Sequence, residues 1–336
     1  MSATKEHDSG KGRRLWVSLA RAAGIVALVC CQPIATALWE YRDKVALFLT
    51  IFQGIFIEAL PFLLLGALAS GFLAVYVKPE VLSRFLPRNR VLGVLAGGLI
   101  GMIYPVCECG AVPVVRRLYQ KGMTPAAGIS FLLASPVLNI IVIFSTAQAF
   151  GWGKMVVARV IMCYVTAVVT GLVFSRLAPG DILLPEVTAN PHDHTRMRWN
   201  DVPFWKAMSL AGDEFMDMVR YLIIGALAAT LAQVLIPQSF FLSWAKGPVL
   251  SVVAMATLAF TLSLCSNVDA FVALGFASFF APGALLAFLV FGSMISIKNV
   301  TMFRSTFRQK AIWRLILVPL VISWSLAILF NLLWRN

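Results

Sequence analysis

The sequence lacks several features that soluble enzymes and nucleotide-driven pumps need. Only 13% of its 336 residues are charged, against roughly 25% in soluble domains, and no polar stretch is long enough to form a separate soluble domain. The pattern G-x-x-x-x-G-K-S/T is absent, so ATP hydrolysis is not encoded on this chain. The chain has 3 histidines and no recognisable cofactor motif. These absences argue against an enzyme, and we expect no cofactor.

The cysteines lack the spacing of a secreted disulfide framework. All 6 lie in apolar segments, so we expect reduced thiols. A free cysteine inside an unbroken apolar helix is ordinarily a small buried hydrophobe, and Cys30, Cys31 and Cys163 are interpreted in that way. The other three lie beside helix-breaking or polar residues, and they are Cys107, Cys109 and Cys265.

Hydrophobic residues are abundant instead, at 60% of the chain. Many apolar runs are long enough to cross a hydrocarbon core of ~30 Å, so the sequence predicts an all-α polytopic membrane protein in a lipid bilayer. The net charge of +13 is explained by basic cytoplasmic loops that face anionic lipid, and we expect no nucleic-acid partner. The first apolar segment follows Lys11, Arg13 and Arg14 and is too long for a cleaved signal, which predicts a retained anchor with a cytoplasmic N-terminus.

Two halves of the chain share a pattern. FIEALPFLLLGALAS from Phe56 and FMDMVRYLIIGALAA from Phe215 both have an acid two residues after the aromatic residue and a glycine eight beyond the acid. Cys107 and Cys265 fall at nearly the same offset. We therefore predict an N-terminal helix followed by two repeats, each with three spans and one re-entrant or broken-helix hairpin. The predicted parts are 1–44 (head and extra helix), 45–176 (first repeat, with the Cys-Glu-Cys hairpin), 177–206 (cytoplasmic linker) and 207–336 (second repeat).

Two membrane topologies remain open. If residues 90–120 and 249–281 form re-entrant hairpins, seven full spans remain, and if each supplies a full span, nine result. The hairpins leave more Lys and Arg in the cytoplasm, with Arg21 and Arg220 inside spans, so the positive-inside bias favours them. Three spans per repeat would also invert the second repeat, an arrangement suited to alternating access. The seven spans are predicted near 15–39, 45–77, 124–149, 153–176, 207–236, 283–300 and 312–333.

The segment between the repeats, LAPGDILLPEVTANPHDHTRMRWNDVP, is polar and rich in proline. It has no hydrophobic period, which is typical of a linker. Its His192-Asp193-His194 triplet supplies too few ligands for a closed metal site. We therefore interpret this triplet as part of a solvated loop.

The stretch YPVCECGAVP places polar groups and helix breakers, among them Pro105 and Gly110, at membrane depth. Non-helical backbone there is tolerated only where it is buried in protein or lines a wet cavity. We therefore expect the tip of a hairpin that faces a cavity. Cys107 and Cys109 would offer soft sulfur, and Glu108 a charge, to a thiophilic solute. Two sulfurs are fewer than a closed metal site needs, so their ligation of a metal would be partial and reversible.

The corresponding stretch of the second repeat, SLCSNVDAF, carries a different set of groups. Cys265 would supply a third sulfur if the two tips meet, whereas Asn267 and Asp269 offer harder oxygen ligands. This mismatch would suit a solute with a soft end and a polar end. It could also separate the substrate from a coupling proton on Asp269 or Glu108.

Further polar residues mark the helices around the tips. Glu58 and Asp217 are repeat-matched acids, and Asp217 lies three positions before Arg220 on one helical face. For Asp217 and Arg220 we prefer a structural ion pair over a role in coupling transport to an ion. Ser135 and Asn139 interrupt the predicted span 124–149, where they would line the cavity wall or hydrogen-bond neighbouring helices.

These motifs resemble a family of bacterial predicted permeases of the YraQ and YcgR type, whose best-understood relative is the organoarsenical efflux permease. The likeness is carried by PVCECGAVPVVRRLYQKGMTPAAGISFLLASPVLN and CSNVDAF. It implies a permease of the bacterial plasma membrane, with efflux as its direction and Cys107 and Cys109 as ligands of a metal or metalloid. The Cys-Glu-Cys form is closer to the branch that pairs with a second small membrane subunit, which implies such a partner.

Two other functions stay open beside a permease for a small thiophilic solute or soft metal species. Cys107 and Cys109 could cycle as a thiol–disulfide redox pair, because a Cys-x-Cys disulfide closes a strained ring that exchanges readily. The chain could also be a non-transporting subunit of a membrane complex. That function predicts an unchanged phenotype when both cysteines are replaced.

Overall fold

The computed structural model describes residues 9–77, 87, 89–104, 106–188, 203–236 and 247–334. Regular structure within these ranges is helical, apart from one isolated bridge between Leu183 and Phe307, which confirms the all-α prediction. Several predictions concern residues outside the described part of the chain. These are Pro105, the triplet 192–194, residues 189–202 of the linker 177–206 and the side chains of Cys30 and Cys31.

Helix α1 runs without interruption from Ser9 to Tyr76. The break that the sequence analysis places between spans 15–39 and 45–77 is not present. The charged stretch 40–44 contains neither proline nor glycine, so no residue removes a backbone hydrogen bond from the helix. The chain divides into two units, Met1–Ile51 and Phe52–Asn336, and the helices and the site described below belong to the second unit.

The helices of the second unit follow the same order in both halves of the sequence. A long helix precedes two short ones, then come two helices that divide one hydrophobic segment, and another long helix ends each half. The first half contains the end of α1, α3 (Arg90–Ile103), α4 (Glu108–Gln120), α5 (Pro125–Ala134), α6 (Ile140–Phe150) and α7 (Lys154–Phe174). The second half contains α10 (Pro203–Leu235), α12 (Pro248–Leu262), α13 (Asp269–Gly275), α14 (Pro282–Met294), α15 (Ile297–Phe303) and α16 (Gln309–Trp334), after the short helices α8 (Pro179–Ile182) and α9 (Pro185–Thr188).

Polar capping residues start the second helix of each divided segment. Asn139 accepts a hydrogen bond from a backbone N–H of α6 at 3.0 Å, and Ser296 does the same in α15 at 3.3 Å. Such side chains satisfy amides that have no partner within the helix. The interruption predicted within 124–149 is therefore confirmed, and the matching segment 283–300 is interrupted in the same way.

The two segments predicted as hairpins each consist of two helices with a non-helical break. Helices α3 and α4 are separated at residues 104–107. Helices α12 and α13 are separated at 263–268, where Ser263 has a left-handed backbone with φ of 50°. The re-entrant placement of these helices, and with it the choice between seven and nine spans, stays a prediction. Among the described residues, 5 helical segments are long and apolar enough to span a membrane, and they are Arg42–Tyr76, Lys154–Phe174, Pro203–Leu235, Pro282–Phe303 and Gln309–Leu333.

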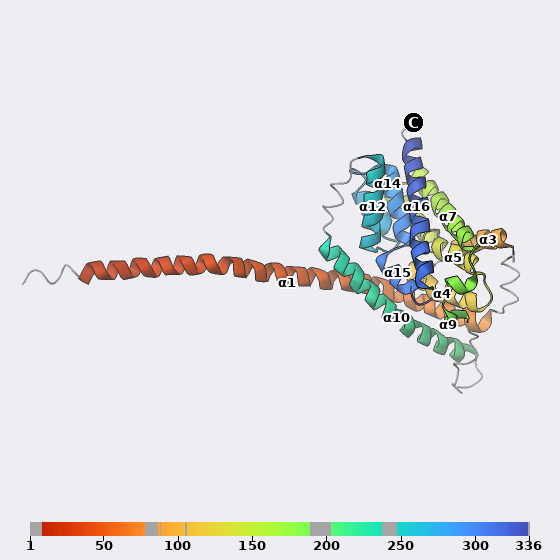
Figure 1. Cartoon of the computed structure of the whole chain (residues 1–336), viewed down its shortest axis with the longest axis horizontal. Coiled ribbons are helices and arrows are strands. Elements are labelled where there is room, and N and C mark those ends of the chain that lie inside the picture. Colours follow the sequence, from red (N-terminus) through yellow and green to blue (C-terminus); the bar gives the residue numbers. More distant parts are fainter. Residues whose placement is uncertain are drawn as a thin grey trace, which may run out of the picture. The chain divides into compact units, whose positions relative to one another are not determined.

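Corresponding helices of the two halves make corresponding contacts (Figure 1). Helix α5 contacts α3 and α7, just as α14 contacts α12 and α16. The segment holding α14 and α15 is the most buried of the candidate spans, with 89% of its apolar stretch inside the protein. The helices that follow the two tips, α4 and α13, each contact a helix of the other half: α4 contacts α15, and α13 contacts α6. Each tip therefore meets the divided helix of the other half.

Glycines permit the closest helix crossings beside these tips. A Cβ added at Gly66 in α1 would overlap the backbone of Gly110 in α4. A Cβ at Gly225 in α10 would overlap the Thr301 side chain and press on the Lys298 backbone in α15. Gly66 and Gly225 are the repeat-matched glycines of the sequence pattern. The same sequence position thus brings α1 against one tip and α10 against the helix that faces it.

Candidate functional site

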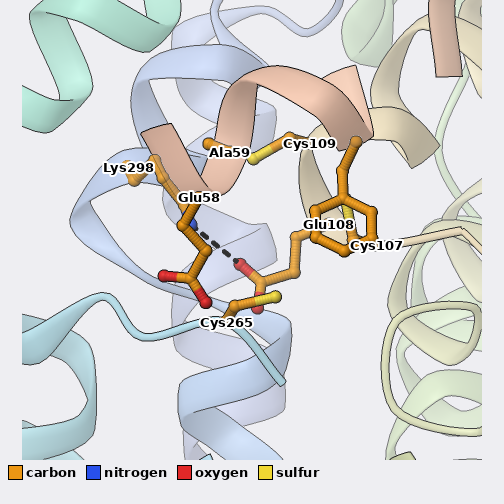
Figure 2. A pocket seen from close by; sticks show the side chains of 8 residues that line it. Glu58, Ala59, Cys107, Glu108, Cys109, Cys265 and Lys298 are labelled. Atoms are coloured by element: carbon orange, nitrogen blue, oxygen red, sulfur yellow. Dashed lines mark ion pairs between the residues drawn. The ribbon is translucent and has the colours of Figure 1, made fainter. Parts of the chain in front are cut away.

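One small cavity lies where α1, the start of α4, the loop before α13 and α15 meet (Figure 2). Its volume is about 10 Å³, which is room for a single water molecule or ion. Thiols, carboxylates and one ammonium group line it together. The lining residues are Glu58, Ala59, Phe62, Cys107, Glu108, Cys109, Cys265 and Lys298.

The first turn of α4 carries the Cys-Glu-Cys motif. Cys107 is the N-cap residue, with an extended backbone (φ −72°, ψ 171°), and Glu108 is the first helical residue. Amides of a first turn lack partners within the helix and favour negative charge nearby. The thiols of Cys107 and Cys109 interact with each other, and only 8% and 2% of these residues is exposed. The motif thus lies at the cavity, and its thiols are removed from bulk solvent.

Cys265 reaches the same cavity from the second half of the chain. It follows the end of α12 on the non-helical stretch that leads to α13, and it is buried. Figure 2 shows Cys265 beside the carboxylates of Glu58 and Glu108, with these side chains directed toward one another. The structure therefore brings sulfur from both predicted tips together, while their role as ligands stays a prediction.

Two residues of α15 meet the Glu108 carboxylate. The amide of Asn299 donates to Oε2 at 2.8 Å, and the ammonium nitrogen of Lys298 lies 3.9 Å from the same oxygen. The other oxygen, Oε1, is buried and accepts no hydrogen bond from any described residue. An unsatisfied carboxylate oxygen is costly to bury. Beside thiols, it offers a free acceptor position to a cation.

Asp269 is held in a separate buried network and does not line the cavity. Its Oδ2 accepts from Arg159 at 2.6 Å and from the Ser293 hydroxyl at 2.5 Å. Arg159 also donates to the Thr146 hydroxyl at 2.6 Å. The structure therefore separates Asp269 from Glu108, which the sequence analysis considers as alternative coupling groups. Because Asp269 is already paired with Arg159, the acids that line the cavity are Glu108 and Glu58.

Three other predicted site residues also lie outside the cavity wall. Asn139 caps α6, and Asn267 is half-buried on the loop before α13. Ser135 is fully buried after the end of α5, and its hydroxyl has no partner among the described residues. The local sequence identified polar interruptions correctly but did not show which of them share a cavity.

Asp217 and Arg220 form the ion pair that their spacing predicts. Both side chains are well exposed, at 45% and 71%, and neither lines the cavity. The repeat-matched acid of the first half, Glu58, does line it. The two halves therefore use equivalent positions differently.

Replacing both members of the exposed pair, as D217N/R220Q, is expected to change the free energy of unfolding by less than about 1 kcal/mol. The double substitution leaves no charge without a partner, and exposed pairs contribute little. Equilibrium unfolding of the purified protein in mixed detergent micelles measures this change. A loss of more than about 2 kcal/mol would show that the pair supports the fold.

Two buried cations were missed by the sequence analysis, which placed only Arg21 and Arg220 inside spans. Arg159 in α7 is 2% exposed and Lys298 in α15 is 3% exposed. The available signal was a single basic residue within MVVARVIM and within MISIKNV. Charged residues inside hydrophobic segments mark buried partners or functional sites.

The far end of α4 is fixed by a second charged cluster. Glu214 of α10 lies 3.0 Å from Arg117 and 3.7 Å from Arg116. Lys121, just after α4, donates to carbonyl oxygens at the end of α1. These contacts hold the helix that carries the Cys-Glu-Cys motif at its opposite end, away from the cavity.

Within the described residues, no group of three or more His, Cys, Asp and Glu is arranged to hold a metal ion. Cys107 and Cys109, the provisional metal ligands, therefore do not belong to a ready-made metal cage. A closed site such as tetrahedral zinc needs four ligands at fixed positions. Binding of a metal here would require the side chains around the cavity to rearrange.

Comparison with known proteins places this chain in a family. A family model described as "Predicted permease" matches residues 44–332. The protein YcgR of Bacillus subtilis (strain 168) is 39% identical over 284 residues, which cover 83% of this chain and 96% of that protein. A protein of Streptococcus mutans, named as a candidate subunit of a two-component membrane permease complex, is 37% identical over 269 residues, covering 79% of this chain and 88% of its own length. No solved structure matches the chain.

Proposed function

Because this chain belongs to the predicted permease family, we propose that it is a multi-pass permease for a small thiophilic solute or a soft metal or metalloid species. The observation that supports this most strongly is the meeting of the buried residues Cys107, Cys109 and Cys265 with the Glu108 carboxylate in one small cavity. Thiolate ligands select soft species over hard ions. A carboxylate in the same cavity adds affinity for positive charge.

The origin of these ligands suits a carrier. Cys107 and Cys109 lie in the first half of the chain and Cys265 in the second, so relative movement of the halves would separate the sulfurs and release the solute. Ligation by a few sulfurs, without a preformed cage, permits exchange. The cavity of about 10 Å³ holds one atom-sized species, so a larger solute would require the tips to move apart.

The proposal includes the setting of the protein. We propose that it acts in the bacterial plasma membrane with its N-terminus in the cytoplasm, and that it exports its solute. A second small membrane subunit is the proposed partner. The Streptococcus mutans relative supports this partner, because its name places it in a two-component permease complex.

An element-accumulation experiment tests the proposed function. Cells lacking the protein, and cells expressing wild type or C107S/C109S, are exposed to arsenite, methylated trivalent arsenicals, zinc, copper, cadmium and mercury, and cell-associated element is quantified. Wild type is expected to lower the content of at least one element about threefold or more, and C107S/C109S is expected to lose most of that effect. Cys163→Ser is the matched control, because Cys163 is buried in α7 away from the cavity.

The other outcomes separate the remaining functions. If C107S/C109S exports like wild type, the thiols are not the ligands and the proposal fails. If no element moves but the protein shifts between oxidised and reduced forms through these two cysteines, the thiol–disulfide function replaces it. If neither solute movement nor redox change depends on them, the chain acts as a non-transporting subunit.

A further inference from the structure

Two buried ion pairs connect the tips to the opposite halves of the chain, and they differ in distance and in hydrogen bonding. Asp269 at the second tip is held by Arg159 at 2.6 Å. Glu108 at the first tip meets Lys298 at 3.9 Å. Arg159 makes further hydrogen bonds to Thr146 and to the Leu289 carbonyl, whereas the Lys298 ammonium makes no hydrogen bond within the described residues. The ion pair of the second tip is therefore tightly hydrogen-bonded, whereas the ion pair of the first tip is long.

The Glu108 side of the loose pair has unused binding capacity. Asn299 occupies Oε2, while Oε1 is buried without a partner among the described residues. The carbonyl oxygen of the Asn299 side chain is also buried and without a described partner. Buried acceptor oxygens without donors are uncommon and mark positions where a ligand or ion completes the bonding. Here they adjoin the thiols of the cavity.

The Lys298 side of the pair is suited to movement. Its ammonium is a compact charge on a flexible four-carbon chain, unlike the planar fork of an arginine. Lys298 lines the cavity together with Cys107, Glu108, Cys109 and Cys265, so its charge lies beside all four groups. The backbone of Lys298 is fixed, because Gly225 of α10 packs against its Cα and carbonyl oxygen. The side chain can therefore swing while the helix stays in place.

We propose that Lys298 is a built-in competitor of the transported species, which must then be a cation. In the empty cavity the ammonium neutralises Glu108, and a soft cation that binds the thiols and Glu108 displaces it. Two positive charges cannot share so small a space without strong repulsion. A neutral trivalent hydroxide such as arsenite brings no charge to replace the ammonium. This inference rests on the proposed function and selects cationic soft metals, such as Cd²⁺, as the substrate class.

Equilibrium binding to the purified full-length protein in detergent tests this inference. Cadmium-109 and arsenite are the probes, and wild type is compared with K298Q, K298R and the control K310Q, whose site is exposed on α16. K298Q is expected to bind Cd²⁺ at least about tenfold more tightly, because the competing charge is gone, with arsenite affinity within about twofold of wild type. K298R is expected to bind Cd²⁺ about tenfold more weakly, since a guanidinium clamps a carboxylate with two hydrogen bonds.

Each result bears on the inference. If K298Q binds Cd²⁺ no more tightly than wild type, Lys298 is only a structural counter-ion and the inference fails, while the proposed function stands. If K298Q does not fold, K298R decides, and unchanged Cd²⁺ affinity in K298R overturns the inference. If wild type binds neither probe, or if C107S/C109S binds them as well as wild type does, the proposed function fails and the inference fails with it.

Discussion

Replacing Arg159 with methionine is expected to lower the free energy of unfolding by about 3–5 kcal/mol. Asp269 is only 3% exposed, so the substitution leaves a buried carboxylate without its cation. It also removes the hydrogen bond to Thr146. Loss of one partner of a buried pair costs far more than loss of both, because the remaining charge has no compensation. Equilibrium unfolding in mixed detergent micelles measures the difference.

Two further variants make this prediction specific. D269N alone is expected to be destabilising, whereas R159M/D269N is expected to recover a large part of the loss, because neither charge then remains. Arg314→Met, at an exposed position of α16, serves as the control and is expected to change stability by less than about 0.5 kcal/mol. A double variant as unstable as the sum of the two single variants would show that the residues do not act as a pair.

Gly66→Ala is expected to lower the free energy of unfolding by about 1–3 kcal/mol and to abolish most of the proposed export. The added Cβ would overlap the Gly110 backbone, and backbone cannot rotate away as a flexible side chain can. Helix α4 would have to shift, and this shift would move Cys107 and Glu108 relative to Cys265. Unfolding in mixed micelles and the element-accumulation experiment measure the two effects.

Gly54→Ala is the matched control, because Gly54 lies in the same helix with nothing within 4 Å of its added Cβ. Alanine favours helix by about 1 kcal/mol over glycine, so this variant is expected to be as stable as wild type or more so. It is also expected to keep full export. If Gly54→Ala and Gly66→Ala behave alike, the close contact between α1 and α4 does not position the site.

Local features of the fold could be predicted from the sequence, because their causes lie within a few residues. Ser135 and Asn139 predict a broken helix since a capping side chain acts on the turn beside it. The Cys-Glu-Cys motif predicts a break at a cavity for the same kind of reason. The continuous α1 differs from the two predicted spans 15–39 and 45–77, because none of the residues 40–44 between them breaks a helix.

The cavity partners could not be predicted in this way. Asn299 and Glu108 are 191 positions apart, and Arg159 and Asp269 are 110 apart, so no local pattern connects them. The sequence of the two tips leaves Asp269 and Glu108 as alternative carriers of a coupling proton. The folded structure shows that each acid is paired across the halves, Asp269 with Arg159 of α7 and Glu108 with Lys298 of α15.

The crossed pairs also bear on how such a chain could specialise. If each half were a separate identical subunit, symmetry would require both tip contacts to be equal, either both rigid or both loose. In a single chain the two contacts are free to diverge, and here one is the bonded Arg159–Asp269 pair while the other is the open Lys298–Glu108 pair. A single chain therefore permits one tip contact to be tightly bonded while the other is open, which two identical subunits could not combine.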